Sequence, residues 1–223
     1  MTKNRLPLVF IMLLVFIFSN TSESLAFRDT KNHWSSEYVT VLNSKNIING
    51  YEDDTFKPDN NITRAEYYAV INRLAGYNKT YAVSFSDVKR TDWFYEEVAK
   101  GIKAGYITPT TGNINPNKEI TREEAIGILG YVFKLSPNIG AAENFKDKRE
   151  IKASAKGYIG ALVDMKIIEG FPDGNIYPKK EITRGEISKI ITLLLDDQGT
   201  PKNTFLMDSE IKFGPKSFYE EGR

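Results

Sequence analysis

The sequence predicts a mainly α protein built from three tandem helix-loop-helix units. A string that begins Ile-Thr-Arg occurs three times, at residues 62–66, 120–124 and 182–186. A proline stands six residues before each arginine, and an aromatic-x-Asp triplet opens each unit. Apolar residues at helical spacing follow both signals, which indicates two helices in each unit.

Composition excludes several classes of function. The chain has 223 residues, with 30 basic and 29 acidic side chains, one His and no Cys. The near-zero net charge argues against a broad basic face for nucleic acid. Without Cys there are no disulfides, thiolate zinc sites or cysteine nucleophiles, and one His cannot build a multi-histidine metal site. We therefore expect no metal, no cofactor and no nucleic-acid partner.

Residues 1–26 have the three parts of a secretory signal peptide. Lys3 and Arg5 give a positive start, residues 6–18 are apolar except for one proline, and Ser24-Leu25-Ala26 offers small residues for cleavage. The apolar run is short for a membrane helix, which needs about 20 residues. We expect cleavage, secretion and no membrane span afterwards; an uncleaved anchor is the alternative. Secretion without Cys is typical of Gram-positive bacteria.

The units span residues 27–84, 85–144 and 145–195, and a tail follows at 196–223. The first helix of each unit has an apolar stripe: Tyr38, Val41 and Leu42 in the first unit, Phe94, Val98 and Ile102 in the second, and Ile159, Leu162 and Val163 in the third. A loop rich in glycine and asparagine follows each first helix. The tail lacks the repeat but keeps several apolar residues, so we expect partial order there.

The Thr-Arg-x-Glu string predicts a capping box at the start of each second helix. Thr63 as N-cap accepts a hydrogen bond from the backbone of Glu66, whose side chain reaches back to the N-cap. The same pairs recur as Thr121 with Glu124 and Thr183 with Glu186. The helices that follow are strongly apolar: Tyr67, Val70, Ile71 and Leu74; Ile126, Leu129, Val132 and Phe133; Ile187, Ile190, Ile191 and Leu194.

An arginine occupies the first helical position in all three units: Arg64, Arg122 and Arg184. The helix dipole disfavours a cation there, and a capping box does not need one. One reading is a solvated residue or a salt bridge to an acid such as Glu124. The other is anion binding, because free amides at a helix start and a planar guanidinium together suit a carboxylate or phosphate. We favour anion binding and expect partly exposed arginines that add little to stability.

These motifs, in this order and triplicated over residues 27–195, resemble the S-layer homology (SLH) domain. The resemblance implies a pseudo-threefold spindle with a central helical bundle. It also implies grooves that bind a secondary cell wall polysaccharide, often pyruvylated. In that family the arginine clamps the pyruvate carboxylate and a loop glycine admits the sugar. Carried over, these residues are Arg64, Arg122 and Arg184 with Gly50 and Gly170.

The second and third units depart from the family pattern. Counting back eight residues from each proline reaches Gly50, Thr108 and Gly170, and the second loop also carries Pro109. A side chain there can block the sugar. Pairing each arginine with the glycine of its own unit, we expect Arg64 and Arg184 to matter more than Arg122. Ser154 replaces the tryptophan in the third unit.

Other candidate site residues have structural alternatives. Trp34 and Trp93 can stack on a sugar, although packing into the core is the commoner role. The opening acids Asp29, Asp87 and Asp147 either accept sugar hydroxyls or cap helices and tie repeats together. His33 lies near Asp29, but no G-x-S-x-G elbow is present, so we expect no catalysis.

Two functions remain open from the sequence. The leading hypothesis is a non-catalytic module that anchors itself or a cargo to the wall or S-layer of a bacterium by binding an anionic polysaccharide. The alternative is a secreted envelope protein whose repeats bind another protein. Co-sedimentation with walls, before and after removal of the polymer, separates the two.

Overall fold

The computed structural model describes residues 27–201, so the predicted signal peptide and most of the tail lie outside the described residues. The described part contains seven helices and no strand, which confirms a mainly α fold. The helices are α1 (Ser36–Ser44), α2 (Arg64–Ala75), α3 (Tyr95–Ala104), α4 (Arg122–Val132), α5 (Ile139–Ala142), α6 (Ala153–Asp164) and α7 (Arg184–Gln198). Within residues 27–201 no helix is long and apolar enough to cross a membrane.

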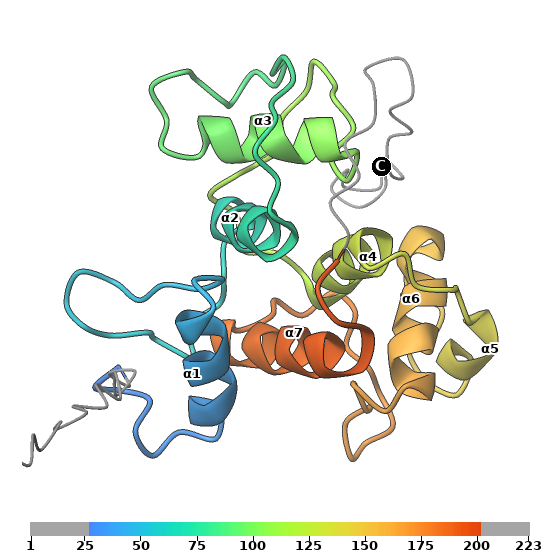
Figure 1. Ribbon diagram of the computed structural model, residues 1–223. Helices are drawn as coiled ribbons and strands as arrows, with labels where there is room; N and C mark the ends of the chain where they lie inside the picture. The colour runs from blue at the N-terminus through green and yellow to red at the C-terminus, as the bar shows by residue number, and fades with distance from the viewer. Residues whose placement is uncertain (1–26, 202–223) are drawn as a thin grey trace, which may run out of the picture.

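Each repeat supplies a first helix (α1, α3 or α6) and a second helix (α2, α4 or α7), and the principal packing crosses between repeats. Helix α3 packs on α2, α6 packs on α4, and α1 packs on α7. Figure 1 shows the second helices towards the middle of the molecule and the first helices outside them. Each first helix thus leans on the second helix of the preceding repeat, with repeat 1 leaning on repeat 3, so no repeat buries its apolar stripe alone.

Three buried isoleucines join the repeats in a closed ring of backbone hydrogen bonds. The N–H of Ile62 donates to the carbonyl of Ile182 at 3.1 Å, that of Ile120 donates to Ile62 at 3.0 Å, and that of Ile182 donates to Ile120 at 3.1 Å. These are the residues that precede the N-cap threonines. The ring therefore fixes the starts of the three second helices relative to one another.

The amides at the start of each second helix are already used. The N–H groups of Arg64 and Ala65 donate to the carbonyls of Lys118 and Pro116, both at 2.9 Å, in repeat 2. The equivalent amides of Arg122 and Glu123 donate to Lys180 and Pro178, and those of Arg184 and Gly185 donate to Asn60 and Pro58. The expectation of free amides for an anion is wrong, because neighbouring loops satisfy them. An anion must be held by side chains instead.

The three predicted capping boxes are all present. In α2 the Thr63 hydroxyl accepts from the Glu66 amide at 3.3 Å, and the Glu66 carboxylate accepts from the Thr63 amide at 2.9 Å. Thr121 with Glu124 and Thr183 with Glu186 make the same reciprocal contacts. These local sequence signals therefore fix where α2, α4 and α7 begin.

The apolar stripes form one continuous core, although Val163 of α6 and some residues of the other predicted stripes are only half buried. The predicted stripe of α2 is buried, and so is that of α4 except for the half-buried Phe133. In α1 the buried residues are Val39 and Leu42, while Tyr38 and Val41 are only half buried. The stripe on α1 is thus rotated from the prediction, because the Val39–Leu42 side is the one that meets its neighbours.

Candidate functional site

The three arginines begin their helices as predicted, but their side chains are buried. Arg64, Arg122 and Arg184 are 2%, 8% and 7% exposed. The expectation of partly exposed arginines is wrong, because each side chain turns away from its own repeat and inserts beside the loop of another. The guanidinium of Arg184 donates to the carbonyl of Asn49 in repeat 1 at 2.8 Å, and that of Arg122 lies 5.6 Å from the ring of Phe171 in repeat 3.

The pairing of arginines with loops is therefore cyclic. Arg184 lies at the Gly50 loop, Arg122 at the Gly170 loop, and Arg64 at the loop of repeat 2, where it approaches the carbonyl of Ile114 at 3.4 Å. The pairing of Arg64 with Gly50 inside one repeat is wrong. The two loops that keep a glycine accompany Arg184 and Arg122.

The Arg184 groove is a hollow of about 580 Å³ that draws on all three repeats. Repeat 1 supplies the loop residues 48–51 and one face of α2, repeat 2 supplies Trp93, and repeat 3 supplies Arg184 and Ser188. Arg73, which the sequence argument did not single out, also lines this groove.

Arg184 is held rigidly within its groove. Its Nε donates to the carbonyl of Phe56 at 2.7 Å, and its guanidinium lies 4.4 Å from the Phe56 ring centroid and 4.8 Å from that of Tyr51. Its Nη1 is 3.9 Å from the Glu66 carboxylate, too far for a hydrogen bond. Burial lowers the pKa of Arg184, while Tyr51 and Glu66 raise it. The side chain remains a cation.

The Arg122 groove is the cyclic counterpart, with a volume of about 860 Å³. Its lining comprises Trp34 from repeat 1, Arg122 from repeat 2, and Lys166, Ile167, Ile168, Glu169, Phe171, Glu186, Lys189 and Ile190 from repeat 3. Three cations face two acids in this hollow. The lining thus carries a positive excess, which suits an anionic ligand.

Arg122 differs from the other two arginines in making no ion pair within residues 27–201. Its side chain makes no hydrogen bond or ion pair with any residue of the described range 27–201, and its Nε is buried and unsatisfied. Burial lowers its pKa, and the charge of Glu186 raises it. A buried cation without hydrogen bonds is costly, so an anion that enters the groove would relieve this cost.

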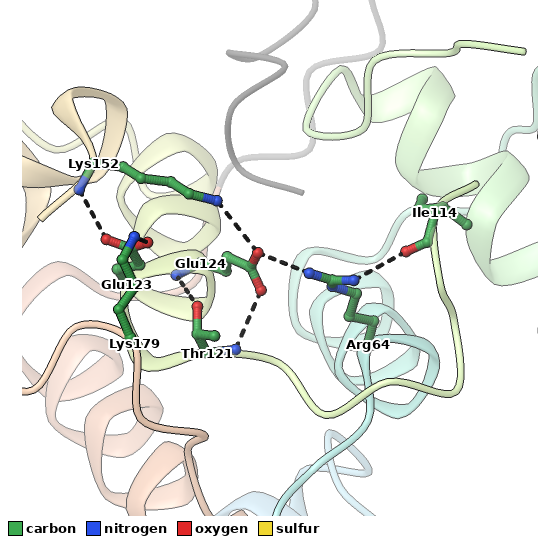
Figure 2. A network of polar contacts seen from close by, with 7 residues as sticks. All are labelled: Arg64, Ile114, Thr121, Glu123, Glu124, Lys152 and Lys179. Carbon is green, nitrogen blue, oxygen red and sulfur yellow. Dashed lines mark hydrogen bonds and ion pairs between the residues drawn. The ribbon is translucent and has the colours of Figure 1, made fainter. Parts of the chain in front are cut away.

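Arg64 already has a carboxylate. Its Nη2 donates to Glu124 at 2.8 Å, both side chains are buried, and the Nζ of Lys152 lies 3.6 Å from the same carboxylate (Figure 2). The Nε of Arg64 is unsatisfied, but its charge is neutralised. The salt-bridge reading considered for the arginines holds at this position.

A second buried acid extends this cluster. The Glu123 carboxylate, 1% exposed, accepts from the backbone N–H of Lys152 at 2.8 Å and pairs with the Lys179 ammonium (Figure 2). Ala65 and Gly185 occupy the corresponding positions of the other repeats. Buried charges from all three repeats thus meet in this cluster.

Both tryptophans lie on the surface of a groove. Trp34 is 53% exposed at the Arg122 groove and Trp93 is 61% exposed at the Arg184 groove. The expectation of core packing is wrong. Each tryptophan comes from the repeat that follows the loop it faces, so the Arg64 position would draw on Ser154, which offers no aromatic ring.

The loop glycines make room for the protein's own aromatic rings. A Cβ on Gly50 would lie 2.1 Å from a ring atom of Phe27 and 2.7 Å from the carbonyl of Thr55. A Cβ on Gly170 would lie 2.6 Å from the ring of Phe145. Each loop therefore folds tightly over the aromatic residue that opens its repeat.

The second loop has a proline at this place. A residue with positive φ follows each first helix: Asn46 after α1, Gly105 after α3 and Lys166 after α6. Four residues further stand Gly50, Pro109 and Gly170. Pro109 rather than Thr108 is thus the counterpart of the glycines. The second loop is one residue shorter than the others between the residue of positive φ and Pro116.

The opening acids hold these loops in shape. Asp29 accepts the backbone N–H groups of Phe56 and Lys57 at 2.9 and 2.7 Å. Asp87 bonds in the same way to Ile114 and Asn115, and Asp147 to Ile176 and Tyr177. The last residue of each pair has a positive φ. This is the structural role among the alternatives, and none of the three acids lines either groove.

His33 forms a chain of contacts with a serine and an acid. Its Nδ1 lies 2.8 Å from the Ser35 hydroxyl, and its Nε2 lies 3.1 Å from Asp59. Ser35 is fully buried, and it packs against Gly185. An enclosed hydroxyl cannot attack a substrate. The contact of Ser35 with Gly185 instead joins repeat 1 to the start of α7. Within residues 27–201 no group of three potential metal ligands converges.

Comparison with known proteins identifies the family. The S-layer homology domain matches three times, at residues 26–67, 84–126 and 144–187, which together cover more than half of the chain. The chain therefore belongs to the S-layer homology domain family.

Several large proteins contain a similar segment. The chain is 35% identical to the amylopullulanase of Thermoanaerobacterium thermosulfurigenes over 78% of its own length and 10% of that protein. It is 28% identical to the surface-layer 125 kDa protein of Lysinibacillus sphaericus over 76% of the chain and 15% of that protein. It is 35% identical to the cellulosome-anchoring protein of Acetivibrio thermocellus over 39% of the chain and 20% of that protein. The chain thus spans a small fraction of each relative.

Proposed function

We propose that this chain is a non-catalytic anchoring module that binds an anionic polysaccharide of a bacterial cell wall through its Arg122 and Arg184 grooves. The observation that carries the proposal is Arg122, a buried guanidinium that makes no hydrogen bond or ion pair among the described residues, beside an open groove. Family membership and the surface-layer and cellulosome-anchoring relatives support a place on the cell surface.

The chemistry of the two grooves suits an acidic sugar. A guanidinium offers a planar pair of donors to a carboxylate, such as the one a pyruvyl ketal carries. Trp34 and Trp93 present exposed rings at the groove walls, where an apolar sugar face can stack. Charge and stacking together favour an anionic saccharide over a neutral one.

The Arg64 position is proposed to be structural. Glu124 already supplies the carboxylate that a ligand would bring, Pro109 replaces the glycine, and Ser154 replaces the tryptophan. An anion would have to displace a buried ion pair in order to bind there. We therefore propose two working grooves in each chain.

We also infer that the three repeats form a pseudo-threefold spindle with α2, α4 and α7 as its central bundle. The closed ring of isoleucine bonds and the cyclic packing of first on second helices support this arrangement. It explains why each groove needs three repeats: the loop comes from one, the arginine from the one before, and the tryptophan from the one after.

Wall co-sedimentation tests the proposed function. The chain should sediment with purified bacterial walls and remain in solution once the secondary polysaccharide has been extracted from them. Arg122→Met/Arg184→Met should remain in solution with both preparations, whereas the matched control Arg149→Gln, an exposed arginine outside both grooves, should behave as the wild type. Sedimentation with extracted walls would favour a protein partner and contradict the polysaccharide proposal.

A further inference from the structure

We infer that the Arg184 groove contains a second anion-binding position, centred on Arg73, so that it takes a saccharide with two anionic groups. The inference rests on the proposed function and deepens it. A single carboxylate clamp needs one guanidinium, yet this groove presents two, and they reach it from different repeats: Arg184 from the start of α7 and Arg73 from the last turn of α2.

Arg73 is anchored in a way that leaves its outer donors free. Its Nε donates to the carbonyl of Ile47 at 2.9 Å, which fixes the guanidinium plane against the loop of repeat 1. Its two terminal nitrogens make no hydrogen bond or ion pair with residues of the described range. A guanidinium held through Nε with both terminal nitrogens unoccupied presents the bidentate edge that carboxylate and phosphate prefer.

Both arginines line the same groove, where Arg184 is buried and Arg73 is exposed to solvent. The positive charge of Arg184 lowers the pKa of Arg73, as burial does to a larger extent, while the nearby Glu97 raises it. Glu97 is itself engaged, by the Lys100 ammonium at 2.8 Å and the Asn72 amide at 2.7 Å. Two cations and one acid, Glu66, thus line this groove, so its charge is positive and suits an anionic ligand.

Arg73 also borders a hollow outside the Arg184 groove. A second hollow of about 410 Å³ is lined by Arg73 together with Asn72, Gly76, Tyr77, Asn78, Glu97 and Lys100. Arg73 is the charged residue shared by both hollows. A saccharide whose acidic terminus lies at Arg184 can therefore extend past Arg73, which places its next anionic group, a carboxylate or a phosphate, against that side chain.

This second position is specific to one groove. Arg73 is the tenth residue of α2, and the corresponding residues of α4 and α7 are Tyr131 and Leu193. The Arg122 groove has no guanidinium at this place, although the ammonium groups of Lys166 and Lys189 line it elsewhere. The two grooves should consequently differ in ligand length: the Arg122 groove binds one acidic unit, and the Arg184 groove binds two.

Isothermal titration in an Arg122→Met background isolates the Arg184 groove. The probes are a pyruvyl-ketal hexose methyl glycoside, which carries one carboxylate, and purified anionic wall polysaccharide. We expect Arg73→Gln to leave affinity for the glycoside within about twofold and to weaken polysaccharide binding about ten- to hundredfold, the effect of losing hydrogen bonds to a charged group. Arg73→Lys should fall in between, and Arg149→Gln should change neither affinity. Thermal melts verify that each variant is folded.

The outcomes distinguish the inference from the function on which it rests. If Arg73→Gln binds both probes as the parent does, the second position is overturned while the proposed function stands. Equal weakening with both probes would place Arg73 at the same carboxylate as Arg184 and would also overturn it. If the unsubstituted chain binds neither probe, the proposed function fails, and the inference fails with it.

Discussion

The guanidinium of Arg64 lies 2.8 Å from the carboxylate of Glu124, and both side chains are almost completely buried. Repeats 1 and 2 are thus joined by a charge pair across their interface. Arg122 occupies the same helical position one repeat later but has no such partner within residues 27–201. Equivalent residues have therefore diverged, one towards stability and one towards an open groove.

Removing one member of the buried pair should be strongly destabilising. Arg64→Met leaves the buried Glu124 carboxylate with Lys152 as its remaining ion-pair partner among the described residues, so we expect a loss of about 3 kcal/mol in the free energy of unfolding. Urea denaturation measures this loss. Arg64→Met/Glu124→Gln should recover much of it, because no uncompensated charge remains. An unchanged unfolding free energy in the single variant would contradict the assignment of Arg64 as a structural residue.

The same substitution at Arg122 should have the opposite consequence. Arg122→Met removes a buried cation that makes no hydrogen bond among the described residues, so stability should stay equal or rise by about 1 kcal/mol. Saccharide binding in that groove should be lost. Denaturation measured in parallel with Arg64→Met provides the comparison, and a destabilisation as large as that of Arg64→Met would reveal a structural role for Arg122 as well.

Gly50→Ala should disturb the loop at the Arg184 groove. The added methyl group would meet the Phe27 ring and the Thr55 carbonyl at distances below any real contact, so we expect a cost of about 1–3 kcal/mol. Gly112→Ala is the matched control, because its nearest neighbour would be 3.6 Å away. Thermal unfolding of both variants checks the difference, and equal melting temperatures would show that the loop relaxes freely.

Low pH should weaken the hydrogen bonds by which the Asp29 carboxylate holds the loop of repeat 1. Burial raises the pKa of this carboxyl, but the amides of Phe56 and Lys57 lower it more, and the net pKa is below its usual 3.8. Because the folded-state pKa is the lower one, the ionised carboxylate contributes stability above about pH 4. That contribution is lost as the pH falls through the folded-state pKa.

The variant Asp29→Asn tests the contribution of this ionised carboxylate. It should be about 1 kcal/mol less stable than the wild type at pH 7, and the difference should shrink at pH 3. Urea denaturation at the two pH values measures both quantities. Asp164→Asn, which alters an exposed acid without a hydrogen bond to the described residues, should show little difference at either pH. A stability difference between the wild type and Asp29→Asn that is as large at pH 3 as at pH 7 would contradict a role for the ionised carboxylate.

Local features of the fold were predictable from the sequence. The capping threonines and glutamates set the starts of α2, α4 and α7, because the interactions that form a capping box span only four residues. The apolar stripes of the second helices followed from helical spacing in the same way. The phase of α1 did not, since the side of α1 that is buried depends on its neighbours in space.

Which residues line each groove was harder to predict from the sequence. The sequence singled out Arg122, Arg184 and both tryptophans, but it paired each arginine with its own loop. The true pairing is cyclic because the isoleucine ring sets each helix start beside the loop of another repeat. Arg73 was missed for a different reason: it occurs in one repeat only, and the sequence argument was built on residues that recur in all three. Its asymmetry with Tyr131 and Leu193 is the signal that was available.

The stoichiometry of saccharide binding tests the central claim most directly. Isothermal titration of the chain with a pyruvyl-ketal hexose methyl glycoside should give two sites, Arg184→Met or Arg122→Met should give one, and the double variant should give none while it still melts cooperatively. Two results would contradict the account of two open grooves and one closed by Arg64 and Glu124. One is a stoichiometry of three sites in the unsubstituted chain, and the other is a double variant that still binds two saccharides.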